Sequence, residues 1–246
     1  MAHRYDTIGA VYSRYRRTDP RIMAQIEVAL ADAASVINIG AGAGAYEPVG
    51  RQVVAVEPSQ VMIAQRAEDR APVLQAVAEA LPAADRSFDA ALATFTVHHW
   101  ADQARGLREM RRVAGRQVIL TFDQDDQWLD EFWLTRDYLP QEHLRGALFS
   151  GLEQVLEEFE AANVEVVPVP SDCRDGFFCA YWRRPEAYLD PNIRASISAL
   201  ALLDDNLIGG GLRQLEEDLR SGAWAERNQK LLDLDAYDYG YRLVVS

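Results

Sequence analysis

Cysteine is scarce in this chain, and only Cys173 and Cys179 occur among its 246 residues. Two cysteines cannot form the framework of disulfides that stabilises small secreted domains. No CxxC pair and no cluster of histidine and cysteine has the spacing of zinc ligands. The sequence therefore predicts a protein of a reducing compartment that holds no metal ion.

Basic residues are outnumbered by acidic ones. The chain has 25 Lys and Arg against 38 Asp and Glu, which gives a formal net charge of -13. Such a charge repels a phosphate backbone unless basic side chains gather on one face. The longest basic cluster, Arg14, Arg16 and Arg17, is small and interspersed with tyrosine. We therefore expect no nucleic-acid partner.

Long apolar runs are missing as well. No uninterrupted run approaches the roughly 20 apolar residues that a membrane-spanning helix needs. The first residues, MAHRYDTIGAVYS, lack the apolar core of a secretion signal. We therefore expect a cytoplasmic protein without a membrane partner, and the sequence leaves open whether it is a monomer or a homodimer.

Short apolar segments alternate with helical patterns along the chain. The expected strands are rich in Val and Ile and span residues 36–41, 53–57, 73–77, 88–95, 117–123 and 164–170. The helices between them carry apolar residues about one turn apart, as Leu107, Met110 and Val113 do. This repeated alternation predicts a doubly wound α/β sheet.

The segment DPRIMAQIEVAL has the features of a helix start. Asp19 can cap the helix, and Pro20 occupies the first helical position, where its missing N–H has no intrahelical partner to lose. Ile22, Ile26 and Leu30 then fall on one face of the helix. We expect this helix to pack on the core.

The most informative stretch is VINIGAGAGAYE, residues 36–47, followed by VVAVEPS, residues 53–59. In α/β folds, a strand that ends in glycines next to a strand that ends in a carboxylate binds an adenosine. The question is which adenosine this pair binds: a dinucleotide, ATP or S-adenosylmethionine.

The spacing after the glycines separates these ligands. Residues 40–45 satisfy the GxGxx(G/A) fingerprint, but only about nine residues follow before the next strand, and Pro48 and Gly50 interrupt them. A dinucleotide would lack the helix that holds its diphosphate. No GK[ST] follows, which excludes a P-loop for ATP. A phosphate-free ligand with adenine, ribose and a short zwitterionic tail needs only the glycines and the carboxylate of Glu57.

Several segments, taken in order, resemble the class I S-adenosylmethionine-dependent methyltransferases of the small-molecule type, a group called methyltransferase type 11. They are INIGAGAGAYE, VVAVEPSQVMIAQR, VAEALPAADRSFDAALATFTVHHW and LREMRRVAGRQVILTFD, which cover about residues 36–123. The resemblance implies S-adenosylmethionine as cofactor and S-adenosylhomocysteine as product. It implies in-line methyl transfer to oxygen, nitrogen or carbon of a small-molecule metabolite. It also implies a Rossmann-like sheet of seven strands in the order 3-2-1-4-5-7-6, with the last strand antiparallel.

The resemblance carries residue roles with it. It assigns cofactor binding to the following residues: Gly40, Gly42, Gly44, Glu57, Met62, Ala78, Glu79 and Thr94. The glycines would line the methionine and ribose, Glu57 would hold the ribose, and Ala78 and Glu79 would edge the adenine. Two positions depart from the family pattern. Asn38 stands where the family most often has Asp or Glu, and Val77 stands where an acidic residue often reads the adenine amine.

The ends of the chain are expected to enclose the site. Residues 1–35 resemble the helical lid of this family, and Tyr12 and Arg16 are expected to close over the cofactor, Arg16 by pairing with its carboxylate. The cofactor-binding core spans residues 36–170, and the terminal stretch at 239–246 is the expected seventh strand.

Residues 171–238 would then form a helical cap insertion at the carboxyl edge of the sheet, where ligands bind in such folds. Its dense aromatic and charged stretch makes Tyr181, Trp182 and Arg183 candidates for contact with the substrate. These large side chains could equally join the cap to the core.

Two histidines follow the fourth expected strand. His98 and His99 are candidates for a general base, which methyl transfer needs only if the acceptor must lose a proton. We place His98 first. In the resembled family the second histidine of such a pair often packs or hydrogen-bonds internally.

Two other functions compete with methyl transfer. The chain could bind S-adenosylmethionine or S-adenosylhomocysteine without transferring a methyl group, in which case the methyl would not face a cavity of acceptor size. It could also be an NAD-dependent oxidoreductase, which would require a full helix over residues 44–53.

Overall fold

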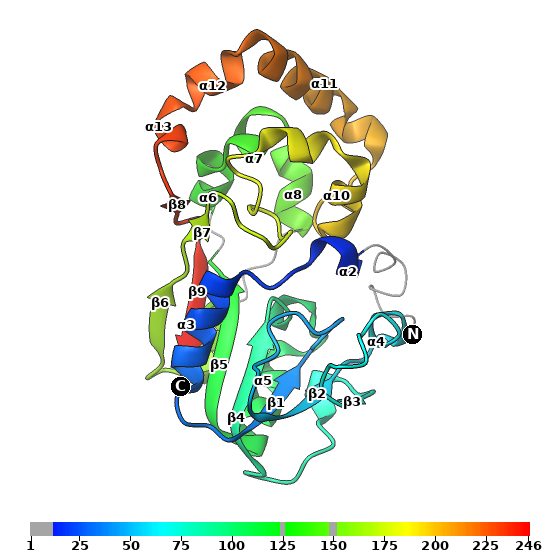
Figure 1. Ribbon diagram of the computed structural model, residues 1–246, viewed down its shortest axis with the longest axis vertical. Coiled ribbons are helices and arrows are strands. Elements are labelled where there is room, and N and C mark those ends of the chain that lie inside the picture. Colours follow the sequence, from blue (N-terminus) through cyan, green and yellow to red (C-terminus); the bar gives the residue numbers. More distant parts are fainter. Residues whose placement is uncertain (1–11, 124–125, 148–151) are drawn as a thin grey trace.

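The computed structural model describes residues 12–123, 126–147 and 152–246. Its centre is a seven-stranded sheet with the order β3-β2-β1-β4-β5-β9-β6 (Figure 1). The strands are β1 (Ser35–Ile39), β2 (Gln52–Val56), β3 (Val73–Leu74), β4 (Phe88–Thr94), β5 (Ala114–Phe122), β6 (Asn163–Val166) and β9 (Tyr241–Val245). The strands from β3 to β5 pair in parallel, whereas β9 is antiparallel to both β5 and β6. This confirms the expected order and the antiparallel seventh strand.

Three expected strands differ from the observed ones by three residues or more at one end. The strand expected over 164–170 divides into β6 and β7 (Val169–Pro170), and β7 pairs with β8 (Ala236–Tyr237) in a separate small sheet. Pro168 lies at the division, and because proline has no N–H it cannot continue the ladder with β9. The strand expected over 73–77 is reduced to β3, and β5 begins at Ala114 rather than at residue 117.

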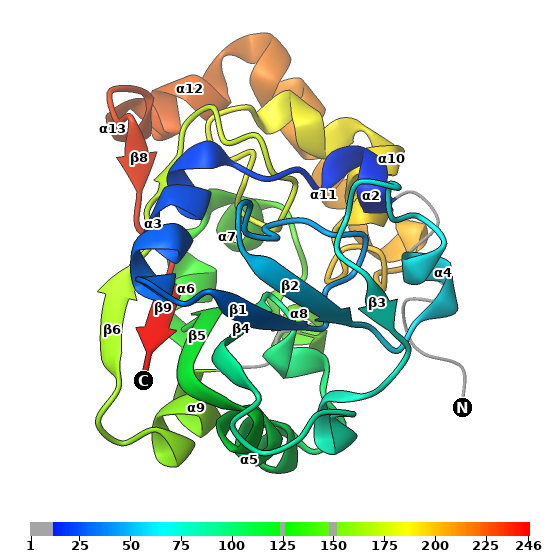
Figure 2. The ribbon, with the colours of Figure 1, turned by 60° about the horizontal axis from the view of Figure 1, so that its bottom comes forward.

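Helices cover both faces of the sheet (Figure 2). Helix α3 (Pro20–Leu30) lies on one face, and α5 (Gln103–Val113) and α9 (Leu152–Glu158) lie on the other. Successive side chains of a strand point to opposite faces. Along β1, Val36 accordingly belongs to the core on the α3 side and Ile37 to the core on the α5 side. Burial on both sides explains why these strands are continuous apolar runs.

Helix α3 begins as the sequence predicts. The side chain of Asp19 accepts a hydrogen bond from the amide of Arg21, and Pro20 is the first helical residue. Ile22, Ile26 and Leu30 are all buried against the sheet. The chain enters α3 from α2 (Tyr12–Tyr15) through an extended segment that crosses between the sheet and the helices drawn above it in Figure 1.

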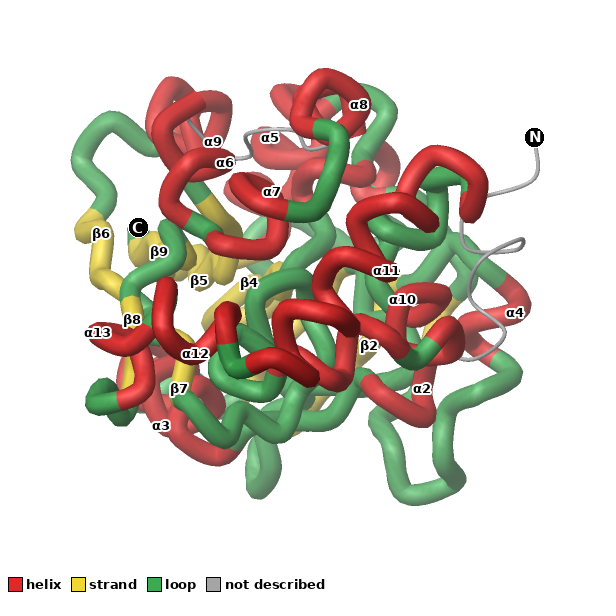
Figure 3. Tube along the Cα trace, turned by 90° about the horizontal axis from the view of Figure 1, so that it is seen from above, coloured by secondary structure: helices red, strands yellow, loops and turns green. Residues whose placement is uncertain are grey.

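A second group of helices lies above the carboxyl ends of the strands (Figure 3). Four of them fall within the expected insertion: α10 (Pro191–Ser196), α11 (Asp205–Ser221), α12 (Ala223–Arg227) and α13 (Gln229–Leu232). Three more follow β5 and were not expected: α6 (Asp126–Glu131), α7 (Trp133–Asp137) and α8 (Gln141–Ala147). The latter are five to seven residues long. Such lengths are too short for a helical apolar period to be recognised.

The upper helices are joined by close packing around large side chains. The indole of Trp133 on α7 is fully buried and donates to the carbonyl of Trp182 at 2.8 Å. Helix α11 approaches the end of α7 through Gly211, where a Cβ would lie 1.7 Å from the carbonyl oxygen of Tyr138. A side chain at position 211 would therefore separate the two elements.

We expect Gly211→Ala to lower the free energy of unfolding by about 3 kcal/mol, because a methyl group cannot fit against the Tyr138 carbonyl. Gly210→Ala is the matched control, because a Cβ at that position meets nothing within 4 Å. In a helix interior this substitution should raise stability by roughly 0.5–1 kcal/mol. Urea denaturation of both variants measures the difference, and equal stabilities would contradict the packing of α11 on α7.

Within residues 12–123, 126–147 and 152–246, no helix combines the length and the apolar character that crossing a membrane requires.

Candidate functional site

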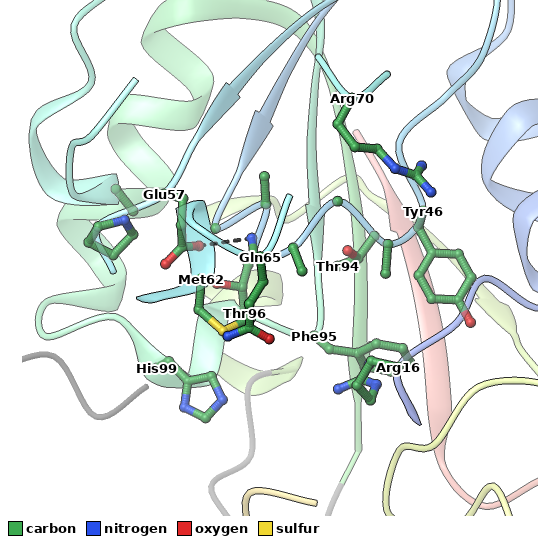
Figure 4. Close-up of a pocket in the computed structure, with 18 of the residues that line it drawn as sticks. Arg16, Tyr46, Glu57, Met62, Gln65, Arg70, Thr94, Phe95, Thr96 and His99 are labelled. Carbon is green, nitrogen blue, oxygen red and sulfur yellow. Dashed lines mark hydrogen bonds between the residues drawn. The ribbon is translucent and has the colours of Figure 1, made fainter. Parts of the chain in front are cut away.

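A cavity of about 440 Å³ lies at the carboxyl ends of β1, β2 and β4. This volume falls within the range of small-molecule sites. The lining comes from the glycine loop after β1, the end of β2, the helix α4 (Gln60–Ile63), the short helix η2 (Ala78–Ala80) and the segment after β4. Figure 4 shows Glu57, Met62 and His99 on one side of the cavity and Arg16, Tyr46 and Phe95 on the other. The cavity is therefore elongated between two chemically different ends.

The glycine loop turns sharply at the end of β1. Gly40 has a φ of 68°, and a Cβ there would lie 2.0 Å from the hydroxyl oxygen of Thr96. Only glycine satisfies both the left-handed backbone and this close approach. The amides of Gly40 and Ala41 both donate to the carbonyl of Val56, at 2.8 and 3.1 Å. The loop is thereby attached to the end of β2.

Glu57 follows β2 and is 5% exposed. Its Oε2 accepts from the amide of Gly42 at 2.9 Å, the contact drawn as a dashed line in Figure 4, and its Oε1 accepts from the amide of Ser59 at 2.9 Å. Two backbone donors therefore hold this carboxylate in one orientation against the cavity. Each carboxylate oxygen has two lone pairs, so the group can accept further hydrogen bonds from a ligand.

No helix follows the glycine loop within residues 40–51, which are turns and bends. The segment therefore lacks the helix that a dinucleotide would need, as the spacing after the glycines predicts. A buried ion pair stands in this region instead, because Arg66 and Glu47 contact each other and both side chains are only 5% exposed. Arg66 also donates to the carbonyl of Gly42 at 3.1 Å and to that of Ala71 at 3.0 Å. The Arg66–Glu47 pair therefore holds the glycine loop in place.

The side of the cavity that holds Glu57 and Met62 includes apolar lining residues. Met62, buried at 2% exposure, lines it together with Val77, Ala78 and Trp100. Glu79 also lines the cavity, but its Oε1 accepts from the amide of Asp102 at 3.1 Å. This end suits a planar aromatic ring with polar edges.

The opposite end carries cations and aromatic rings. The guanidinium of Arg16 lies 5.4 Å from the ring centre of Phe95, and both residues line the cavity with Tyr46. Arg70 also lines the cavity, and its Cδ would lie 2.9 Å from a Cβ at Gly44. A ligand carboxylate at this end would meet positive charge.

Phe95 has an unusual backbone. Its φ is 53°, although bulky side chains rarely adopt left-handed conformations, and its amide donates to the carbonyl of Leu120 at 2.8 Å. Such strain is retained where the surrounding structure demands it, and it concentrates at ligand sites. Here it turns the chain directly after β4 and places the ring in the cavity wall.

The two histidines are not equivalent. His99 lines the cavity, whereas His98 is outside the lining and packs with ring-centre distances of 3.8 Å to His99 and 4.8 Å to Phe122. Their order as base candidates is therefore reversed from the expectation. The short helix η3 (Val97–His99) causes this, because it rotates consecutive side chains to different sides.

Most of the expected cofactor residues come together in this cavity. Its lining includes Arg16, Gly40, Gly42, Gly44, Glu57, Met62, Ala78, Glu79 and Thr94. The side chain of Tyr12 lies outside the described residues. The cofactor roles themselves remain predictions.

The expected substrate residues lie elsewhere. The indole of Trp182 is fully buried and donates to the carbonyls of Val169 and Pro170, so it presents no surface to a ligand. Arg183 donates to the carbonyl of Leu234 at 2.9 Å, and the ring of Tyr181 packs 5.8 Å from that of Tyr188. None of the three lines the cavity. The internal packing of Trp182 agrees with the alternative left open by the sequence, in which such side chains join the cap to the core.

The sequence did not predict several of the lining residues. Phe95 could have been found, because it directly follows Thr94 at the carboxyl end of a parallel strand. Tyr46 and Arg70 carry no such signal, because each lies in an irregular segment without a helical or strand period. Among the described residues, no three His, Cys, Asp or Glu side chains are grouped to hold a metal ion.

We expect Arg66→Met to lower the free energy of unfolding by about 3–5 kcal/mol, because the carboxylate of Glu47 would stay buried without its partner. The double variant Arg66→Met/Glu47→Leu should recover part of this loss, since it removes the unpaired charge. Arg70→Met is the control, as its side chain is 38% exposed and its nearest acid, Asp69, is 4.0 Å away. Urea denaturation that gave equal losses for Arg66→Met and Arg70→Met would refute the bracing role.

Comparison with known proteins gives a consistent result. Residues 37–122 match a family described as methyltransferase domain. A solved structure from Anabaena variabilis, a provisionally named methyltransferase from an antibiotic biosynthesis pathway, is 30% identical to this chain. The alignment covers 94% of this chain and 98% of that chain, with a TM-score of 0.78.

Two curated relatives are similar over shorter segments. The uncharacterized methyltransferase YcgJ of Bacillus subtilis is 30% identical over 112 residues, which is 39% of this chain and 44% of the relative. The ubiquinone/menaquinone biosynthesis C-methyltransferase UbiE of Geotalea uraniireducens is 29% identical over 140 residues, which is 50% of this chain and 60% of the relative. The chain thus spans about half the length of the curated relatives it matches.

Proposed function

This chain belongs to the methyltransferase domain family of S-adenosylmethionine-dependent enzymes, and on that premise we propose that it methylates oxygen, nitrogen or carbon of a small-molecule metabolite. One observation in the cavity gives this proposal its main support. The carboxylate of Glu57 is fixed by the amides of Gly42 and Ser59 beside a glycine loop that no helix follows. This arrangement suits an adenosine that carries no phosphate.

The chemistry of the lining fits S-adenosylmethionine along the whole cavity. The apolar side chains of Met62 and Ala78 suit the adenine, and the acceptor oxygens of Glu57 suit the two ribose hydroxyls. At the other end Arg16 and Arg70 suit the carboxylate of the methionine tail. The ring of Phe95, which packs against the guanidinium of Arg16, also lines this end and would contribute a π system near a sulfonium.

When bound, S-adenosylmethionine supplies a methyl group that its sulfonium already activates, so the protein chiefly positions the acceptor. Phe95 and Thr96 form part of the cavity wall. His99, which lines the cavity, is our candidate to receive a proton from an acceptor that is a hydroxyl or an acidic carbon. An amine acceptor that is already neutral needs no such base.

The competing functions receive less support. A dinucleotide would need a helix over residues 44–53 to hold its diphosphate, and this segment has none. A protein that binds S-adenosylmethionine without transferring its methyl group has the same cofactor cavity. Only an acceptor assay separates that function from methyl transfer.

The cofactor assignment is tested by calorimetric titration with S-adenosylmethionine, S-adenosylhomocysteine and NAD. We expect the two sulfur ligands to bind and NAD not to bind. Glu57→Ala should weaken binding by about 2–4 kcal/mol, because two charge-assisted hydrogen bonds to the ribose are lost. Glu57→Gln keeps the shape of the side chain and should show a smaller loss.

Glu68→Ala provides the control, since Glu68 is exposed and does not line the cavity. Its affinity for S-adenosylhomocysteine should equal that of the unchanged protein. Binding of NAD alone, or of none of the three ligands, would reject the proposed function.

The base is tested with a panel of hydroxyl, amine and acidic-carbon acceptors, followed by mass-spectrometric detection of S-adenosylhomocysteine. With a hydroxyl or acidic-carbon acceptor, His99→Gln should slow turnover by roughly 10²–10⁴-fold, and the loss should shrink as the pH rises. His98→Gln should have a smaller effect, because His98 lies outside the cavity lining. Equal losses in both variants would contradict a base at His99.

A further inference from the structure

Asp175 is a buried carboxylate in the loop between β7 and the upper helices, and it is 0% exposed. Its Oδ1 accepts from Nε of Arg16 at 2.7 Å and from the amides of Arg17 and Gly176 at 3.2 and 2.7 Å. Its Oδ2 accepts from Nη2 of Arg16 at 3.3 Å and from the hydroxyl of Tyr46 at 3.0 Å. Three segments that are distant in the sequence therefore meet at one side chain.

Two of the donors to Asp175 belong to the cavity wall. Arg16 and Tyr46 line the cavity, whereas Asp175 itself does not. The guanidinium of Arg16 is held between the carboxylate of Asp175 and the ring of Phe95, another wall residue. Any displacement of Asp175 therefore moves the wall at the end proposed for the methionine tail.

A second acid ties the same segments together. Asp19, also 0% exposed, accepts from Nη2 of Arg21 at 2.8 Å and from the amide of Arg174 at 3.0 Å, and its own amide donates to the hydroxyl of Tyr46 at 3.4 Å. The phenol of Tyr46 thus joins Asp19 and Asp175. Burial in the first place, and then the charge of Asp175, raise the pKa of Tyr46 well above 10. The phenol consequently remains a donor to Asp175 throughout the neutral range.

We propose that Asp175 is a positioning residue for cofactor binding. It holds Arg16 and Tyr46 in place, and it thereby couples the packed position of the loop at residues 172–178 to the cavity. The loop leads into the upper helices, so the cofactor and these helices stabilise each other through one carboxylate. By thermodynamic linkage, a ligand that binds better when Arg16 and Tyr46 are held in place must also stabilise the packed position of this loop. This inference rests on the proposed cofactor site.

The test compares Asp175→Asn with Asp172→Asn, a variant of an acid on the same loop. Asp172 is 79% exposed and pairs with Arg21 at the surface. The dissociation constant of S-adenosylhomocysteine is measured by calorimetry at a temperature below the onset of unfolding for each variant. We expect Asp175→Asn to raise it at least tenfold, because Arg16 loses its ionic partner. Asp172→Asn should change it less than twofold.

Tyr46→Phe removes only one hydroxyl, so it can test the positioning role of Asp175 even if Asp175→Asn does not fold. It should raise the dissociation constant about threefold by itself, and it should add little to Asp175→Asn in the double variant, because the hydroxyl of Tyr46 acts through Asp175. Hydrogen exchange supplies a readout that lost stability alone would not move. S-adenosylhomocysteine should slow exchange of the amides of residues 172–178 in the unchanged protein and in Asp172→Asn, but not in Asp175→Asn.

The outcomes distinguish failure of the proposed function from failure of the positioning role of Asp175. If the unchanged protein fails to bind S-adenosylhomocysteine, the proposed function is rejected. If it binds, and Asp175→Asn or Tyr46→Phe binds with the same affinity, the positioning role of Asp175 is rejected while the cofactor site stands. Ligand protection of residues 172–178 that persists in Asp175→Asn would likewise overturn the coupling.

Discussion

The site depends on the way in which both backbone groups of Gly42 are held by charged side chains. Its amide donates to Glu57 from the end of β2, and its carbonyl accepts from Arg66, whose charge is balanced by the buried Glu47. In most nucleotide-binding α/β folds a helix that begins at the glycines provides this rigidity. Here the chain has too few residues for that helix, and a buried ion pair takes its place. The position of the carboxylate that faces the cavity follows from this single brace.

Patterns that are local in the sequence predicted local structure well. The alternation of strands and helices, the cap of α3 at Asp19 and the lining positions of Gly40 and Glu57 follow from apolar periods, turn residues and the carboxyl edge of a parallel sheet, whereas the strand order was implied by the family resemblance. Each of these depends on neighbours within about one turn or one strand, or on the one edge to which every parallel strand points its carboxyl end.

Features that depend on distant partners could not be predicted in this way. Trp182 looks like a ligand residue by its chemistry, yet its indole is fully buried and bonded to β7. Asp175 looks like one acid among many, yet Arg16 and Tyr46 converge on it from positions more than 100 residues away. His98 and His99 differ only because a short 3₁₀ turn separates their directions. Composition identifies the residue type in each case, and only the tertiary contacts decide its role.

The strand β9 sits between β5 and β6 although a long excursion through β7, the upper helices and β8 separates it from β6. The entropy lost in closing such a loop grows only with the logarithm of its length, so that doubling the excursion adds only about 0.6 kcal/mol. The helices between β7 and β8 can therefore be lengthened, shortened or exchanged during evolution while the sheet and its glycine loop stay intact. A lineage can alter what is admitted above the strands without redesigning the fold that supports them.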